Sequence, residues 1–124
     1  MSLKHYQELT VWQKAMDLVQ AVYGATKCFP REEIYGLTSQ VRRAAVSIPS
    51  NIAEGQGRNS TKEFLHHLSI AHGSLCELET QVIVAQRLHY IGSENVDRVT
   101  ALTQSVGQLL NGLMRSLRQK EQTS

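Results

Sequence analysis

The stretch that decides the fold spans residues 35–58 and reads YGLTSQVRRAAVSIPSNIAEGQGR. Its apolar residues recur every three or four positions, which is the spacing of one buried face of an α-helix; they are Leu37, Val41, Ala45, Ile48 and Ile52. Pro49 interrupts this helical pattern, because proline has no amide proton for the carbonyl of Ala45 and its ring crowds that carbonyl. We therefore predict a helix that is kinked at Pro49 and that ends at Gly55 and Gly57.

The composition is that of one ordinary domain. A chain of 124 residues is long enough for one hydrophobic core. The net charge is only +2, from 13 basic and 11 acidic side chains, and this balance alone does not mark a nucleic-acid-binding protein. The two cysteines form no closely spaced ligand pair, and no apolar run approaches the length of a membrane span. We expect a cytoplasmic protein with reduced thiols and no contact with a membrane.

Three further apolar patterns have helical spacing, and the four expected helices cover about residues 10–28, 31–55, 60–90 and 93–118. Pro30 suits the start of the second helix. Ser60 and Glu63 form a capping box, which predicts the start of the third helix. Gly73 lies in the middle of that helix and indicates close packing there. Long helices joined by short turns predict an all-α fold, a single up-down-up-down antiparallel four-helix bundle over residues 1–124.

Two motifs carry metal-ligand chemistry, but neither is complete. Glu63 and His66 have the Glu-x-x-His spacing of di-iron bundles, which need that motif on two helices and a glutamate on each of the other two. The sequence has no second copy. His72 and Cys76 lie one helical turn apart, whereas zinc needs three or four protein ligands. We therefore predict no metal and no other cofactor.

The sequence also lacks the patterns of a catalytic site. Nothing marks a nucleophile elbow or an activated thiol. Glu77 and Glu79 are two residues apart, so on a helix they point in different directions and are not expected to act as an acid–base pair. We predict that the protein is not an enzyme.

One run, Ser47-Ile48-Pro49-Ser50-Asn51-Ile52-Ala53-Glu54-Gly55, is specific enough to suggest a family. It is accompanied by Trp12-Gln13-Lys14-Ala15, Phe29-Pro30, Tyr35-Gly36-Leu37, Gln40-Val41-Arg42-Arg43-Ala44, Glu63-Phe64 and Gly73-Ser74-Leu75-Cys76-Glu77-Leu78-Glu79-Thr80. Over about residues 9–91 these motifs resemble the 23S rRNA intervening-sequence protein family. The resemblance implies a small bacterial four-helix bundle, of a kind that is in some cases encoded inside insertions in large-subunit rRNA genes.

The same resemblance takes in the accessory variability determinant proteins of diversity-generating retroelements. It implies a homopentameric barrel that binds RNA or DNA and a reverse transcriptase. The residues themselves favour a homo-oligomer as well, because the first two helices carry more apolar and small surface than one bundle seam can cover.

The candidate nucleic-acid contacts are the basic residues of the segment 36–62. This segment carries four cations against one acidic residue; the cations are Arg42, Arg43, Arg58 and Lys62. Arginine binds phosphate and carboxylate equally well. Arg42 and Arg43 are therefore also candidates for ion pairs with a glutamate of a structural or interface polar cluster. This cluster consists of Asn51, Glu54, Glu77 and Glu79.

Two functions stay open on this basis. The first is a non-enzymatic nucleic-acid-binding accessory protein, and the second is a structural or protein-interaction scaffold. Arginines paired with carboxylates favour the scaffold, whereas unpaired arginines favour nucleic-acid binding. If Arg42 and Arg43 are paired, Arg58 and Lys62 beside the glycine turn are the better phosphate contacts.

Overall fold

The computed structural model describes residues 5–123, which form five α-helices, one 3₁₀ turn and no strand. The elements are α1 (His5–Glu8), α2 (Thr10–Thr26), η2 (Arg31–Glu33), α3 (Leu37–Gln56), α4 (Thr61–Arg87) and α5 (Ser93–Thr123). The chain is therefore all-α, as the sequence predicts. Within these residues no helix combines the length and the apolar content that a bilayer span requires.

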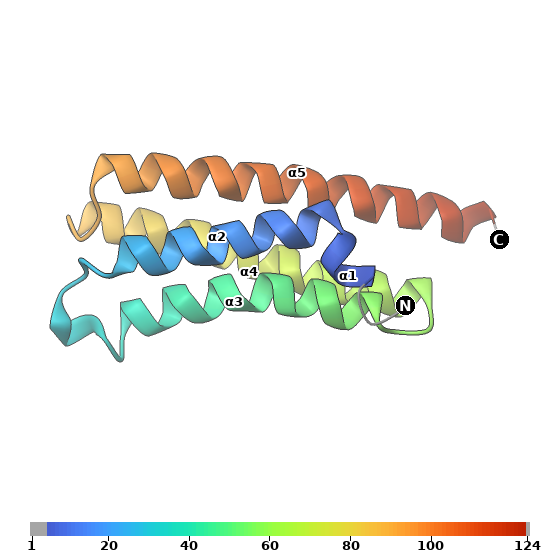
Figure 1. The fold of residues 1–124 in the computed structure, drawn as a ribbon, viewed down its shortest axis with the longest axis horizontal. Helices are drawn as coiled ribbons and strands as arrows, with labels where there is room; N and C mark the ends of the chain where they lie inside the picture. The colour runs from blue at the N-terminus through green and yellow to red at the C-terminus, as the bar shows by residue number, and fades with distance from the viewer. Residues whose placement is uncertain (1–4, 124) are drawn as a thin grey trace.

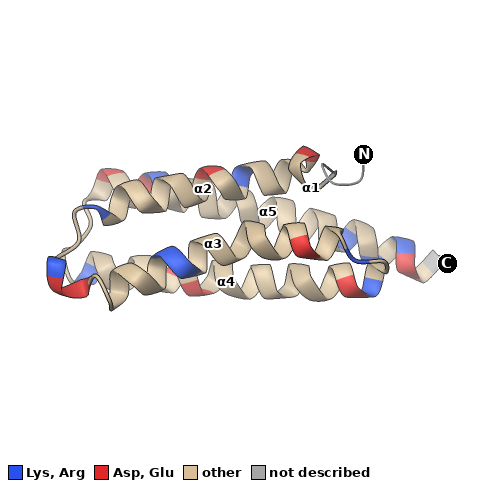
Figure 2. Cartoon of the chain, turned by 60° about the horizontal axis from the view of Figure 1, so that its bottom comes forward, with Lys and Arg blue, Asp and Glu red and all other residues tan. Residues whose placement is uncertain are grey.

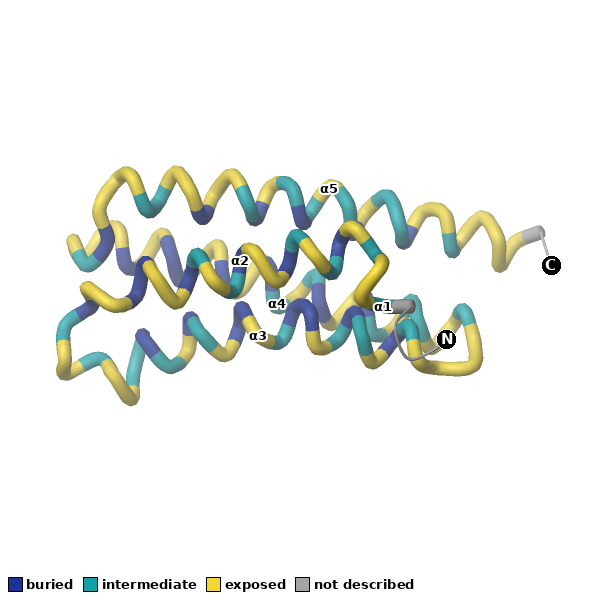
Figure 3. Tube along the Cα trace, in the orientation of Figure 1, coloured by how far each residue is buried: buried dark blue, intermediate teal, exposed yellow. Residues whose placement is uncertain are grey.

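The four long helices lie side by side, and each runs opposite to the helix before it (Figure 1). α2 packs against α3 and α5, and α4 packs against the same two helices. The end of α5 extends past the turn between α3 and α4 (Figure 1), and its last residues are mostly exposed (Figure 3).

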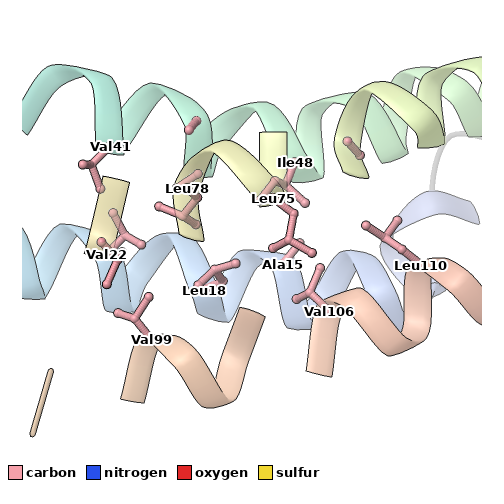
Figure 4. Close-up of a cluster of buried hydrophobic side chains, with 14 of the residues drawn as sticks. Ala15, Leu18, Val22, Val41, Ile48, Leu75, Leu78, Val99, Val106 and Leu110 are labelled. Atoms are coloured by element: carbon pink, nitrogen blue, oxygen red, sulfur yellow. The ribbon is translucent and has the colours of Figure 1, made fainter. Parts of the chain in front are cut away.

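Every long helix contributes to one hydrophobic core. Leu18, Ile48, Leu78 and Leu110 come from α2, α3, α4 and α5 in turn, and each is 0% exposed. Figure 4 shows the core side chains pointing toward one another between the helices. Burying a side chain of this size contributes about 1.5–3 kcal/mol. The apolar periodicity in the sequence therefore predicts the buried faces well.

The second predicted helix, 31–55, is in fact two elements. η2 covers only Arg31–Glu33, and α3 begins at Leu37 after a turn. The Glu33 side chain stabilises this division, because its Oε1 accepts the backbone amide of Leu37 at 3.0 Å and so caps the new helix. A Cβ on Gly36 would lie 2.7 Å from that same Oε1, so glycine leaves room for the capping carboxylate.

α3 continues without a break through Pro49, whose side chain is buried. The kink that proline should cause there stays a prediction. The helix ends at Gln56 with Gly57 as its cap, so Gly55 lies inside the helix rather than at its end. A Cβ on Gly55 would lie 2.7 Å from the Cβ of His67. Glycine at this position therefore permits the close approach of α3 to α4.

The remaining boundaries also differ by a few residues from those predicted. The first long helix ends at Thr26 instead of 28, and α1 precedes it. The last helix reaches Thr123 instead of 118. α4 begins with the predicted cap, since the Ser60 hydroxyl accepts the Glu63 amide at 3.1 Å. The close packing expected at Gly73 is absent from this chain, because a Cβ there would meet no described atom within 4 Å.

α4 ends at Arg87, before the predicted residue 90, because His89 adopts a left-handed backbone conformation with φ 61°. The amide of Tyr90 then bonds the carbonyl of Ala85 at 2.9 Å, as in a Schellman motif. The Tyr90 hydroxyl donates to Glu33 Oε2 at 3.0 Å. Glu33 thus joins the start of α3 to the connection between α4 and α5.

Candidate nucleic-acid interface

The four predicted cations do not form one patch. Arg42 and Arg43 lie in the first half of α3, whereas Arg58 follows the end of α3 and Lys62 lies in the first turn of α4. At 1.5 Å per residue the two pairs are about 20 Å apart along the helix. Figure 2 shows basic and acidic segments interspersed along the helices rather than gathered by sign.

Arg42 faces α2 and is held by neutral groups. Its Nε donates to Thr26 Oγ1 at 2.8 Å, and its guanidinium lies 4.6 Å from the centre of the Tyr23 ring. The predicted alternative was a pairing with a glutamate. Among the residues that the structure describes, no carboxylate pairs with Arg42. Its guanidinium is therefore fixed in place while its charge stays uncompensated.

Arg43 is the next residue and faces α4 instead. With Ser47, Ser74 and Glu77 it lines a shallow depression of about 270 Å³. Although Glu77 shares this depression, it forms no ion pair with Arg43 in the described part of the chain. Two adjacent arginines thus point to different neighbouring helices. A pairing of Arg43 with a carboxylate of another copy stays a prediction.

Arg58 is the candidate that does meet a carboxylate. Its Nη2 lies 2.7 Å from Glu54 Oε2, one helical turn away, and the side chains are 44% and 54% exposed. Such an exposed pair contributes only about 0.3–0.5 kcal/mol and is screened by salt. Lys62 is exposed too, and no described carboxylate pairs with it. Lys62 is therefore available to a phosphate, and Arg58 can reach one if its weak pair with Glu54 opens.

Asn51 joins α3 to α4 through a polar network. Its Nδ2 donates to the Ser47 carbonyl at 2.9 Å and to the Ser47 hydroxyl at 3.0 Å. The Ser47 hydroxyl lies 2.8 Å from that of Ser74, and Asn51 Oδ1 lies 3.3 Å from Nδ1 of His67. No sequence pattern marked Ser74 or His67 as part of such a network. Only their positions on the α4 face toward α3 could have indicated this role.

The other members of the predicted polar cluster lie apart from Asn51 in this chain. Glu54 bonds Arg58, and Glu77 accepts a long contact of 3.5 Å from Gln81. Glu79 lines depressions between α4 and α5, away from α3. A cluster assembled from two copies of the chain stays a prediction.

His72 and Cys76 approach each other as their spacing predicts, with Nδ1 and Sγ 3.9 Å apart. In the part of the chain that the structure describes, no three histidine, cysteine, aspartate or glutamate side chains gather into a metal-binding group.

Comparison with known proteins identifies the family. The model of the 23S rRNA-intervening sequence protein family matches residues 7–112. The chain therefore belongs to this family. Comparison with curated proteins gives no match.

One similar solved structure is a protein of unknown function from the S23 ribosomal protein family of Bacteroides thetaiotaomicron. The TM-score is 0.79 at 22% sequence identity, and the match covers 93% of this chain and 99% of that one. At this identity the likeness shows a shared fold.

Proposed function

We propose that this is a cytoplasmic, non-enzymatic accessory protein that binds RNA or DNA and that acts as a homo-oligomer of four-helix bundles, each bent at Pro49. One observation carries the proposal: three of the four candidate cations have no carboxylate partner within the described chain. Arg42 is held by a hydroxyl and an aromatic ring, and neither Arg43 nor Lys62 forms an ion pair there. Uncompensated cations of this kind are available to phosphate.

The test is nucleic-acid affinity measured against salt concentration. Replacing both Arg58 and Lys62 with alanine removes two phosphate contacts, so the log–log slope should flatten by about 1.8 per engaged subunit. Arg87→Ala with Arg98→Ala is the matched control, because it removes the same charge from exposed positions at the other end of the molecule. The control should leave the slope unchanged. No binding by the parent protein at low salt would overturn the proposal.

Exposed apolar side chains on α4 support self-association. Ile83, Val84 and Leu88 are 52%, 40% and 49% exposed near the end of this helix. Apolar side chains exposed so close together in the chain are often covered in an assembly. We propose a pentamer, on the resemblance to the accessory variability determinants. Light scattering should then give five times the 13.9 kDa of one chain, and a monomer at micromolar concentration would contradict it.

The scaffold function is the second candidate, and the same apolar side chains favour it. It predicts a stable oligomer that binds no nucleic acid at any salt concentration. For a protein partner we propose a reverse transcriptase, again on the resemblance. Co-elution of the two purified proteins tests this pairing.

A further inference from the structure

The loop between α2 and α3 borders a hollow of about 340 Å³ that no sequence pattern marked. We call it the loop hollow. Its polar lining consists of Thr26, Lys27, Arg31, Thr38 and Arg42. It lies at the end of the molecule opposite the turn that carries Arg58 and Lys62 (Figure 1). Its volume is within the range of small-molecule sites.

The charge of the loop hollow is of one sign. Its lining includes three cations and no carboxylate. The nearby loop carboxylate of Glu33 is directed elsewhere, since its two oxygens accept the Leu37 amide and the Tyr90 hydroxyl. The lining of the loop hollow therefore favours an anion, while the carboxylates of Glu32 and Glu33 follow Arg31 in η2 outside that lining.

Arg42 is already positioned for such an anion. The hydrogen bond from Nε to the buried Thr26 hydroxyl and the contact with Tyr23 fix the plane of its guanidinium. Its two terminal nitrogens form no hydrogen bond within the described residues and stay available for two parallel hydrogen bonds. A fixed guanidinium of this kind favours an oxyanion with adjacent oxygens.

Thr38 supplies an independent sign of a ligand. It lies in the first turn of α3, is only 5% exposed, and its hydroxyl makes no hydrogen bond within the described chain. The Thr38 hydroxyl is not among the described side-chain atoms that are unpaired and completely buried; that description fits Gln81 Oε1. The Thr38 hydroxyl is therefore accessible, and Thr38 lines the loop hollow. A hydroxyl that lines a hollow and has no protein partner can donate to an acceptor on a ligand.

The helix ends around the hollow do not add to this preference. In the first turn of α3 the carboxylate of Glu33 already accepts the Leu37 amide, and α2 ends beside the hollow at Thr26, with the negative end of its dipole. The preference for an anion therefore rests on the cations of the lining and on Thr38.

We propose that the loop hollow binds the phosphate monoester of a nucleotide, either free or at the end of a nucleic-acid strand. Several donors converge on the hollow, and a phosphate monoester offers three acceptor oxygens and up to two negative charges, whereas a carboxylate offers two oxygens and one charge. Phe29, Pro30 and Ile34 form the apolar part of the lining, which gives the nucleoside a surface to pack on. The inference goes beyond the proposed function, because it uses neither Arg58 nor Lys62.

Calorimetric titration of the full chain with adenosine 5′-monophosphate tests the proposal, with adenosine as the ligand that lacks the phosphate. Arg42→Gln should weaken binding of the monophosphate at least about tenfold, since it removes charge-assisted hydrogen bonds. Thr38→Val keeps the shape of the side chain and should weaken binding roughly threefold. Thermal unfolding of each variant shows that the fold is kept.

Arg98→Gln is the matched control, because it makes the same charge change at an exposed residue of α5 that does not line the loop hollow. It should leave the affinity within about twofold of the parent. The proposal is overturned if the parent does not bind the monophosphate, if adenosine binds equally well, or if Arg98→Gln weakens binding as much as Arg42→Gln.

Oligonucleotides with a 5′-phosphate or a 5′-hydroxyl distinguish the two sources of the phosphate. A preference for the phosphorylated strand that Arg42→Gln abolishes supports a site for a strand end. Equal binding of both strands, with binding of the monophosphate retained, supports a site for a free nucleotide. Neither result depends on the salt slope of the Arg58 and Lys62 variant, so the two proposals can fail separately.

Discussion

The two ends of the molecule carry similar charges in different surroundings. At one end, which we call the turn end, residues 55–63 connect α3 to α4. At the other, which we call the hollow end, residues 26–38 surround the loop hollow. Cations at the turn end are exposed, and Arg58 bonds a neighbouring glutamate. At the hollow end Arg42 is half buried and is fixed by Thr26 and Tyr23.

This difference shows that the residues around a cation decide how well it can bind a ligand. An exposed cation contributes a contact that salt screens and that its own flexibility weakens. A cation fixed beside a buried, unpartnered hydroxyl is already oriented for its ligand. We therefore expect the turn end to contribute salt-dependent affinity and the hollow end to contribute selectivity for a phosphate group.

The largest effect is expected from a substitution that destabilises the turn end. Gly55→Ala would place a Cβ 2.7 Å from the Cβ of His67 and 3.0 Å from Cδ1 of Phe64. The Cβ of His67 cannot move away by a change of rotamer, so we expect a loss of about 1–3 kcal/mol. Chemical denaturation measures it. An unchanged midpoint would show that α3 and α4 separate easily at this end.

The same substitution at Gly73 should have the opposite sign. A Cβ there meets nothing within 4 Å in the described chain, so alanine gains only its better helix propensity. We expect a stabilisation of about 1 kcal/mol, again by chemical denaturation. Destabilisation together with a lower mass in light scattering would instead show that a second copy of the chain covers Gly73.

A smaller effect is expected at the connection that borders the hollow end. His89 has φ 61°, a left-handed conformation that costs little only for glycine. His89→Gly should therefore stabilise the protein by about 0.5–1 kcal/mol, after the larger entropy of the unfolded glycine chain is counted. Thermal unfolding tests this. A loss of stability would mean that the imidazole makes a contact in the assembled protein.

The smallest effect concerns pH at the hollow end. The hydrogen bond to Glu33 raises the pKa of Tyr90 above its ordinary value of 10.0, and desolvation and the charges of Glu33 and Glu32 add to it. The neutral phenol is thus favoured by the fold, so its contribution is complete below pH 10 and is lost as the pH rises through the raised pKa. Comparing the parent with Tyr90→Phe by phenolate absorbance should show a tyrosine that ionises late. Ionisation at the ordinary pH would contradict the bond to Glu33.

Local patterns in the sequence predicted much of the fold. The apolar spacing identified the buried faces, and Ser60 with Glu63 marked the start of α4, because both signals act within a few residues. The division of the second helix was missed because Glu33 caps α3 from the preceding turn. Within one described chain Gly73 does not show the expected packing, because the sequence does not reveal which glycines face a neighbouring helix; Gly55 does so most closely.

The candidate site was harder to predict, since it depends on partners from different helices. The sequence marks Arg42 and Arg43 as cations but does not show that one faces Thr26 and the other faces Ser74 and Glu77. The loop hollow had one available signal, a threonine in the opening turn of a helix that follows Lys27 and Arg31. Its meaning depends on burial, which a single sequence does not supply.

The polar network between α3 and α4 has a direction. The Asn51 nitrogen donates to Ser47, so its oxygen faces His67 and accepts a hydrogen bond in the tautomer that has the proton on Nδ1. In that tautomer the donors run one way, from His67 through Asn51 to Ser47. A slip of either helix along the other would face donor with donor or leave the groups unpaired, whereas an apolar seam of leucine and valine tolerates such a slip. The polar network thus fixes the register of α3 against α4, whereas the hydrophobic effect holds the two helices together without selecting one register.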